Sequence, residues 1–210
     1  MIAARDALAR LRDGNRRFVS NAREHEDLHA RRAELTMRQE PFAIVLGCSD
    51  SRVPAEIVFD QGLGDLFVIR VAGNIVAPSL VGSVEFAAAR FGTRLVVVLG
   101  HSQCGAIDAT IEALLGPAST GSPNLQAIVD RVRPAVLPLL ETDLRDDRDA
   151  LARAAVRANI QASTRHLRHG SALLEGLIAS DGLLVAGAEY SLESGAVTFL
   201  EEPPETAQVR

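Results

Sequence analysis

Phe42-Ala43-Ile44-Val45-Leu46 is a continuous apolar run that ends at Gly47. A short run without a polar residue is typical of a β-strand that is buried on both faces. The segments 66–71 (LFVIRV) and 95–100 (LVVVLG) repeat this character further along the chain. Three such runs predict a central sheet that is covered by other elements.

The segments around these runs have helical patterns. Residues 79–90 place Leu80 and Val84 on one face together with Ala87 or Ala88, which predicts a helical crossover between the second and third strands. Buried strands that are separated by helices indicate an α/β fold with a mainly parallel central sheet covered by helices.

Both ends of the chain add elements to this core. Residues 2–20 carry apolar side chains at helical spacing among charges, and residues 22–40 are strongly polar, so residues 1–40 are predicted to form an N-terminal arm of one or two helices. Residues 183–188, a turn at Glu193-Ser194-Gly195 and residues 197–200 predict a C-terminal hairpin strand. The length of 210 residues fits a single domain, with the α/β core at 41–210.

Charge and hydropathy exclude several classes of partner. With 27 acidic and 22 basic side chains, the formal net charge is −5, so no basic field exists to hold a phosphate backbone. No window reaches the ~18 consecutive apolar residues that span a bilayer, and the N-terminus lacks the apolar core of a secretion signal. We therefore expect no nucleic-acid partner, no membrane partner and a cytoplasmic location.

The two cysteines need an explanation other than a disulfide, because a lone pair in a cytoplasmic chain is a poor candidate for one. Cys48-Ser49-Asp50-Ser51-Arg52 follows the first strand, and His101-Ser102-Gln103-Cys104 follows the third. In open α/β sheets the ligand crevice forms at the carboxyl ends of the strands. We therefore expect these two segments to converge on one site.

Local geometry supports such a site. If His101 and Cys104 lie on the first turn of a helix, they share one face, and the helix N-terminus favours the thiolate. In an extended segment, Cys48, Asp50 and Arg52 project to the same side of the chain.

Two thiolates and one imidazole suit tetrahedral zinc, with Cys48, His101 and Cys104 as ligands. One coordination position is left for water or for Asp50, and an open position indicates catalysis. We expect Arg52 to hold the Asp50 carboxylate bidentately, so that Asp50 accepts the proton of a zinc-bound hydroxide and orients it toward an electrophile.

Other interpretations of the same residues remain. A cysteine at a strand end is often an inert small apolar residue, and an Asp-x-Arg pair is often a surface salt bridge. A zinc-stabilised binding module would need no turnover, although structural zinc is normally closed by four Cys or His ligands. A redox protein is disfavoured because Cys48 and Cys104 form no Cys-x-x-Cys unit.

The two motifs resemble those of the β-class carbonic anhydrases, whose signature is Cys-x-Asp-x-Arg followed about fifty to sixty residues later by His-x-x-Cys. The segments 14–18 (GNRRF), 67–74 (FVIRVAGN) and 82–87 (GSVEFA) extend the likeness over nearly the whole chain. The resemblance implies a lyase with one Zn²⁺ per subunit that interconverts carbon dioxide and bicarbonate. It also implies a homodimer or homotetramer, with the N-terminal helices wrapped over the neighbouring subunit and the active-site cleft at the interface.

The resemblance further implies a substrate pocket. Gln39 matches the family's hydrogen-bond donor to the substrate, Phe67 and Phe86 match its apolar walls, and Gly105 directly follows the second motif. Phe67 and Phe86 could equally be plain core residues. Phe86 stands where many relatives carry Tyr, so a hydrogen bond from that hydroxyl is lost.

The alternative function is hydrolysis of carbon disulfide or carbonyl sulfide, since relatives with the same zinc site attack those molecules.

Overall fold

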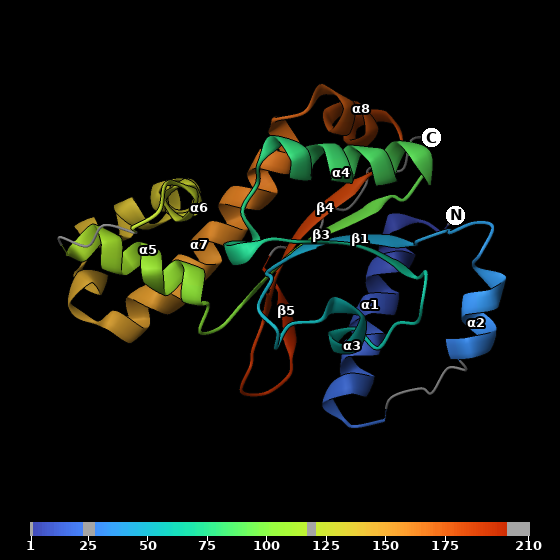
Figure 1. The fold of residues 1–210 in the computed structure, drawn as a ribbon, viewed down its shortest axis with the longest axis horizontal. Helices are drawn as coiled ribbons and strands as arrows, with labels where there is room; N and C mark the ends of the chain where they lie inside the picture. The colour runs from blue at the N-terminus through green and yellow to red at the C-terminus, as the bar shows by residue number, and fades with distance from the viewer. Residues whose placement is uncertain (1, 23–27, 117–120, 201–210) are drawn as a thin grey trace, which may run out of the picture.

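The computed structural model describes residues 2–22, 28–116 and 121–200 (Figure 1). The strands are β1 (Ala43–Gly47), β2 (Leu66–Arg70), β3 (Leu95–His101), β4 (Leu184–Tyr190) and β5 (Val197–Phe199). The helices are α1 (Ala4–Val19), α2 (Leu28–Glu34), α3 (Ala55–Val58), α4 (Pro78–Arg90), α5 (Gly105–Leu115), α6 (Pro123–Val136), α7 (Arg148–His169) and α8 (Ala172–Ser180). Short 3-10 helices cover Ala72–Asn74, Leu137–Glu141 and Asp143–Asp146.

The five strands form one sheet in the order β2-β1-β3-β4-β5. All neighbours pair in parallel except β5, which is antiparallel to β4 and forms the C-terminal hairpin. In this register Gly47 at the end of β1 lies beside Arg70 of β2 and Leu99 of β3. The predicted α/β fold with a mainly parallel sheet is therefore confirmed, and the carboxyl ends of β1 and β3 lie side by side.

Two apolar layers enclose the sheet because alternate side chains of a strand point to opposite faces. Ile44 and Val98 face one layer, which contains apolar side chains of α4, α5, α6, α7 and α8. Val45 and Val97 face the other layer, which contains apolar side chains of α1 and α3 (Figure 1). The predicted N-terminal arm thus begins with a helix that packs on the sheet.

The edge strand β2 differs from the prediction that all three apolar runs are buried on both faces. β1 and β3 are buried throughout, but Phe67 and Val68 of β2 are only half-buried. The reason is the strand order, because β2 pairs with β1 alone among the described strands.

None of the helices in the described ranges combines the length and the apolar character needed to cross a bilayer.

Candidate metal centre and active site

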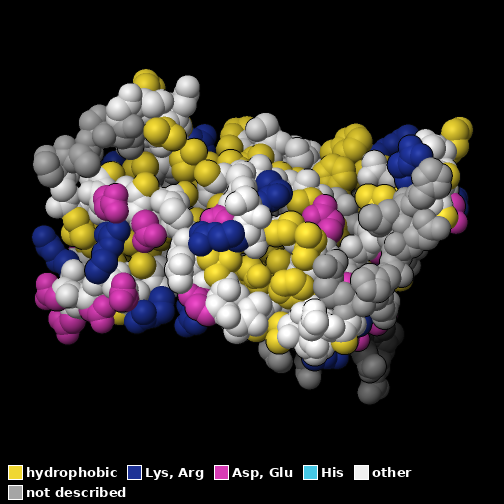
Figure 2. Space-filling model, turned by 60° about the horizontal axis from the view of Figure 1, so that its bottom comes forward, with side chains coloured by type: hydrophobic (Ala, Val, Ile, Leu, Met, Phe, Trp, Pro, Cys, Tyr) yellow, Lys and Arg dark blue, Asp and Glu magenta, His cyan; other side chains and the backbone are white. Residues whose placement is uncertain are grey.

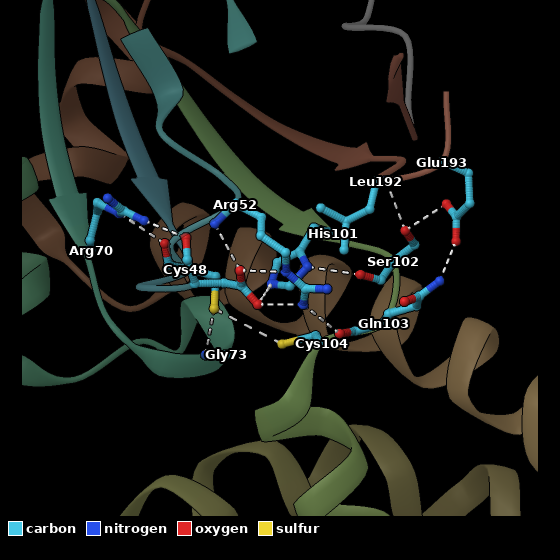
Figure 3. A network of polar contacts seen from close by, with 11 residues as sticks. Cys48, Arg52, Arg70, Gly73, His101, Ser102, Gln103, Cys104, Leu192 and Glu193 are labelled. Carbon is cyan, nitrogen blue, oxygen red and sulfur yellow. Dashed lines mark hydrogen bonds and ion pairs between the residues drawn. The ribbon is translucent and has the colours of Figure 1, made fainter. Parts of the chain in front are cut away.

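Cys48, His101 and Cys104 lie together at the carboxyl ends of β1 and β3 (Figure 3). Cys48 directly follows β1, His101 is the last residue of β3, and Cys104 immediately precedes α5. The prediction that His101 and Cys104 share the first turn of a helix was wrong. A tight turn at Ser102 and Gln103 brings them together instead, with Gln103 at a φ of 54°.

The spacing of the three side chains fits a zinc ion. Their ligand atoms all lie within 4.8 Å of one another, and the Cys48 and Cys104 sulfurs are 4.0 Å apart. Bonds of about 2.3 Å in a tetrahedral zinc site place two sulfurs ~3.8 Å apart, which is close to this separation.

His101 is oriented for the same ion. Its Nδ1 donates to the Ser102 carbonyl oxygen at 2.8 Å, while Nε2 is a buried nitrogen without a hydrogen-bond partner in the described part of the chain. Such orphaned buried groups are rare because each costs desolvation free energy. A metal ion beside the sulfurs would satisfy Nε2, so the donor set fits zinc.

The pKa values of the two thiols shift in opposite directions because they share one hydrogen bond. The pKa of Cys48 is lowered to about 4, chiefly because the Cys104 thiol donates a hydrogen bond to it, and the backbone N–H of Gly73 contacts the same sulfur at 3.3 Å. The pKa of Cys104 is raised by that hydrogen bond and by burial. Burial lowers the pKa of His101, but the neighbouring Cys48 thiolate and the Ser102 carbonyl raise it on balance. A thiolate beside an imidazole is the combination that binds zinc.

Asp50 and Arg52 form a bidentate ion pair beside this cluster. Arg52 donates from Nε to Oδ1 of Asp50 at 2.9 Å and from Nη2 to Oδ2 at 2.7 Å, and its backbone N–H also reaches Oδ1 at 2.9 Å. The Arg52 hydrogen bonds hold the pKa of Asp50 well below its usual range. Oδ2 of Asp50 lies 3.9 Å from Nε2 of His101, so the carboxylate faces the cluster.

The backbone around this pair is not extended, which corrects the prediction for residues 48–52. The N–H of Val53 donates to the carbonyl oxygen of Asp50 at 3.0 Å and closes a turn that folds Arg52 back onto the carboxylate. Arg70 braces the same segment from β2, because its guanidinium donates to the carbonyl oxygens of Cys48 and Asp50 at 3.0 and 2.6 Å. Both features fix where the carboxylate points.

Gly105, one of the four residues expected in the substrate pocket, directly adjoins the cluster. Gly105 begins α5 directly after Cys104, and a Cβ at this position would meet no atom within 4 Å. Gln39 is exposed in the segment before β1, whereas Cys48 follows β1. A five-residue strand spans ~16 Å, so the structure does not bring Gln39 to the cluster of its own chain.

Phe67 and Phe86 belong to an aromatic cluster whose third member, Phe91, sequence reasoning missed. The ring centroids are 6.3 Å apart for Phe67 and Phe86, 5.9 Å for Phe67 and Phe91, and 5.6 Å for Phe86 and Phe91. Phe86 is 54% exposed and Phe67 is half-buried, so neither is a plain core residue within one chain.

Fold and site together define an α/β protein with a buried centre of two cysteines and one histidine beside an Asp–Arg pair. A family model described as "Carbonic anhydrase" matches residues 43–197. The carbonic anhydrase of Mycolicibacterium smegmatis is 40% identical over 188 residues, which cover 89% of this chain and 88% of that relative. "Carbonic anhydrase 2" of Mycobacterium tuberculosis is 37% identical over 188 residues, which cover 88% and 87%.

A solved structure supports the same assignment. A tetrameric β-carbonic anhydrase from Sordaria macrospora matches with a TM-score of 0.72 at 25% identity, over 80% of this chain and 84% of that chain. The chain belongs to the β-carbonic anhydrase family, and it is an enzyme, a carbonic anhydrase.

Proposed function

We propose that this enzyme uses one zinc ion per subunit to catalyse the reversible hydration of carbon dioxide to bicarbonate and a proton. Cys48, His101 and Cys104 would hold the ion, and Asp50 with Arg52 would orient the reacting groups. The observation that carries this proposal is the buried cluster of two sulfurs and the orphaned Nε2 of His101. Membership of the β-carbonic anhydrase family supports the same reaction.

Zinc bound by these ligands would supply a nucleophile, because it lowers the pKa of a water that it holds. The Asp50 carboxylate would select which oxygen atoms can bind beside it. Its carboxylate stays ionised, since the Arg52 hydrogen bonds lower its pKa, and an ionised carboxylate can only accept hydrogen bonds. It therefore favours an oxygen that carries a hydrogen and orients the lone pairs of that oxygen away from itself.

Arg52 keeps Asp50 in this role. Two donors of the guanidinium and the Arg52 backbone N–H occupy both carboxylate oxygens, so rotation of Asp50 would break several charge-assisted hydrogen bonds. A fixed acceptor next to the reacting atoms avoids reorganisation during the reaction, which is a main source of catalytic power.

We infer that a second copy of the chain completes the substrate pocket. Gln39 precedes β1 and is exposed, so it would serve the centre of a partner subunit rather than its own. Phe67 and Phe86 would form apolar walls for an uncharged substrate, and Gly105 leaves room beside Cys104. Figure 2 shows hydrophobic side chains at the surface among charged ones, and exposed apolar surface of this kind supports an interface between subunits. The tetrameric relative from Sordaria macrospora also supports an oligomer.

Hydrolysis of carbon disulfide or carbonyl sulfide at the same centre is the second candidate. Both molecules are linear and uncharged, as carbon dioxide is, so the metal ligands do not separate the two activities. The named relatives are carbonic anhydrases, and the comparisons do not favour this alternative.

The experiment combines metal analysis with stopped-flow hydration of carbon dioxide on one preparation. We expect about one zinc per chain, loss of activity after chelation and recovery after zinc is restored. Asp50→Asn should keep the zinc but lower kcat by about 10²–10³-fold, which is the usual cost of removing one preorganised group. A zinc-free wild-type enzyme of full activity would contradict the metal centre, and unchanged turnover in Asp50→Asn would contradict the role of Asp50.

A further inference from the structure

The turn between the two ligands of the second motif has two contacts to the proposed centre. The carbonyl oxygen of Ser102 accepts from Nδ1 of His101 at 2.8 Å, which turns Nε2 toward the sulfurs. The carbonyl oxygen of Gln103 accepts from Nη2 of Arg52 at 3.3 Å, and Arg52 in turn holds Asp50. The orientation of this one turn therefore affects a ligand and the ion pair together.

This turn does not hold its shape by backbone preference alone. Gln103 has a φ of 54°, in the left-handed region that is costly for residues other than Gly, Asn and Asp. A conformation of this kind persists only where the surroundings determine it. The question is which group keeps Ser102 and Gln103 in place.

The Glu193 side chain, from the turn between β4 and β5, contacts both residues (Figure 3). Its Oε2 accepts from Oγ of Ser102 at 2.9 Å, and its Oε1 accepts from Nε2 of Gln103 at 2.7 Å. Ser191 donates to the same carboxylate at 3.0 Å, and the Leu192 N–H donates to Oγ of Ser102 at 2.9 Å. The two carboxylate oxygens thus bridge the side chains of the two turn residues.

The Glu193 carboxylate is suited to a positioning role and unsuited to carrying protons. Its own backbone N–H and the donors of Ser102, Ser191 and Gln103 lower the pKa of Glu193 to about 2. The group therefore remains ionised at neutral pH and accepts both hydrogen bonds continuously, as charge-assisted bonds.

We propose that Glu193 is a positioning residue of the metal centre: by holding Ser102 and Gln103, it fixes the His101 ring and the Arg52–Asp50 pair. The inference rests on the proposed function, because zinc is the group that these residues would face. Outer contacts of this kind orient ligands and typically contribute 10- to 100-fold to metal affinity or activity.

Glu193 lies at an exposed site, so its effect on the proposed centre can be distinguished from an effect on overall stability. Glu193 lines an open cavity of about 670 Å³ that also reaches Cys104, and hydrogen bonds at an exposed site contribute little to the free energy of unfolding. Asp149 of α7 lines the same cavity and is exposed, but it makes no hydrogen bond to the turn in the described part of the chain. Asp149→Asn is therefore a matched control for the loss of one negative charge.

The experiment compares Glu193→Ala, Glu193→Gln and Asp149→Asn with the wild-type zinc enzyme. The first readout is the rate of zinc transfer to a chromophoric chelator, and the second is the visible absorption of the cobalt(II)-substituted protein, which reports ligand geometry. The third is kcat and KM for carbon dioxide hydration, and thermal unfolding monitors the fold.

For Glu193→Ala we expect about tenfold faster zinc transfer, an altered cobalt spectrum and about tenfold lower kcat with little change in KM. Glu193→Gln should recover part of each effect. Its amide oxygen can accept from Ser102, and its amide nitrogen can donate to the Gln103 side chain once that amide rotates. Asp149→Asn should match the wild type in all three.

Wild-type zinc transfer and cobalt absorption in Glu193→Ala would overturn the inference, as would a change in thermal unfolding alone. Equal changes in zinc transfer, cobalt absorption and kcat in Glu193→Gln and Asp149→Asn would also overturn the inference. The effect would then come from the lost charge and not from the position of the side chain. If Glu193→Ala does not fold, Glu193→Gln decides by the same readouts. A wild-type protein that binds neither zinc nor cobalt would overturn the proposed function itself, and the inference with it.

Discussion

The Cys–His cluster of Cys48, His101 and Cys104 and the aromatic cluster lie in one chain but differ in how complete they are. Cys48, His101 and Cys104 are 4%, 0% and 2% exposed, and the ends of β1 and β3 and the start of α5 in the same chain position all three. Phe86 is 54% exposed, and Gln39 lies before β1, while the cluster lies after it. The chain therefore builds the proposed centre alone and leaves the proposed pocket open.

The difference follows from the parallel sheet. Adjacent parallel strands bring their carboxyl ends to one edge, so residues that directly follow β1 and β3 must meet. No such rule acts on Gln39, which lies before β1, or on Phe86, which is exposed on α4. Variants of the centre should thus act within one subunit, and variants of the pocket should depend on assembly.

The largest effect is expected from Cys104→Ser. A hydroxyl cannot replace the thiolate as a zinc ligand, so most of the metal should be lost. Activity should fall by at least about 10³-fold, since a metal contribution of several kcal/mol corresponds to about three factors of ten. Zinc content by elemental analysis checks this result, with Asp50→Asn as the variant that keeps its metal. Full zinc occupancy in Cys104→Ser would show that Cys104 is not a ligand.

The sequence was sufficient to predict the sheet and the convergence of the two motifs. Uninterrupted apolar runs such as 95–100 identify buried strands, and the position of Cys48 directly after such a run places it at the crevice. These are local patterns, so the three side chains that the structure brings together could be proposed as ligands before any coordinates.

The sequence was not sufficient for features that depend on distant contacts. The turn at Gln103 has a left-handed backbone that glutamine seldom adopts, so His101 was placed on a helix instead of on β3. Glu193 was interpreted only as part of a hairpin turn, because its bonds reach residues about 90 positions earlier in the chain. The exposure of β2 followed from the strand order, which apolar runs do not encode.

An intermediate effect is expected from Gln39→Ala. Loss of one hydrogen bond to an uncharged substrate costs about 1 kcal/mol, which lowers kcat/KM by roughly tenfold or less. A mixture of Gln39→Ala with Asp50→Asn, under conditions of subunit exchange, tests whether the pocket depends on a partner subunit while the centre does not. If Gln39 acts in the partner's site, hybrid dimers regain one intact site each.

Random pairing in a two-fold dimer then restores about one quarter of all sites, which exceeds the averaged activity of the two variants without exchange. The control is the same mixture without subunit exchange, which should keep the averaged activity of the two variants. An exchanged mixture that stays at this average would mean that Gln39 acts within its own chain or not at all.

The smallest effect is expected from Phe86→Ala, which removes an exposed ring from the cluster with Phe67 and Phe91. Partial loss of an apolar wall is worth about 1 kcal/mol, so KM should rise three- to fivefold while kcat changes little. If a partner subunit covers this ring, the variant should also dissociate at higher protein concentration in analytical ultracentrifugation. Leu125→Ala is the matched control, because Leu125 has the same exposed fraction of 54% and lies on α6. Leu125→Ala should change neither KM nor the dissociation constant of the oligomer. A Phe86→Ala enzyme that behaves like Leu125→Ala would place the aromatic cluster outside both the pocket and the interface.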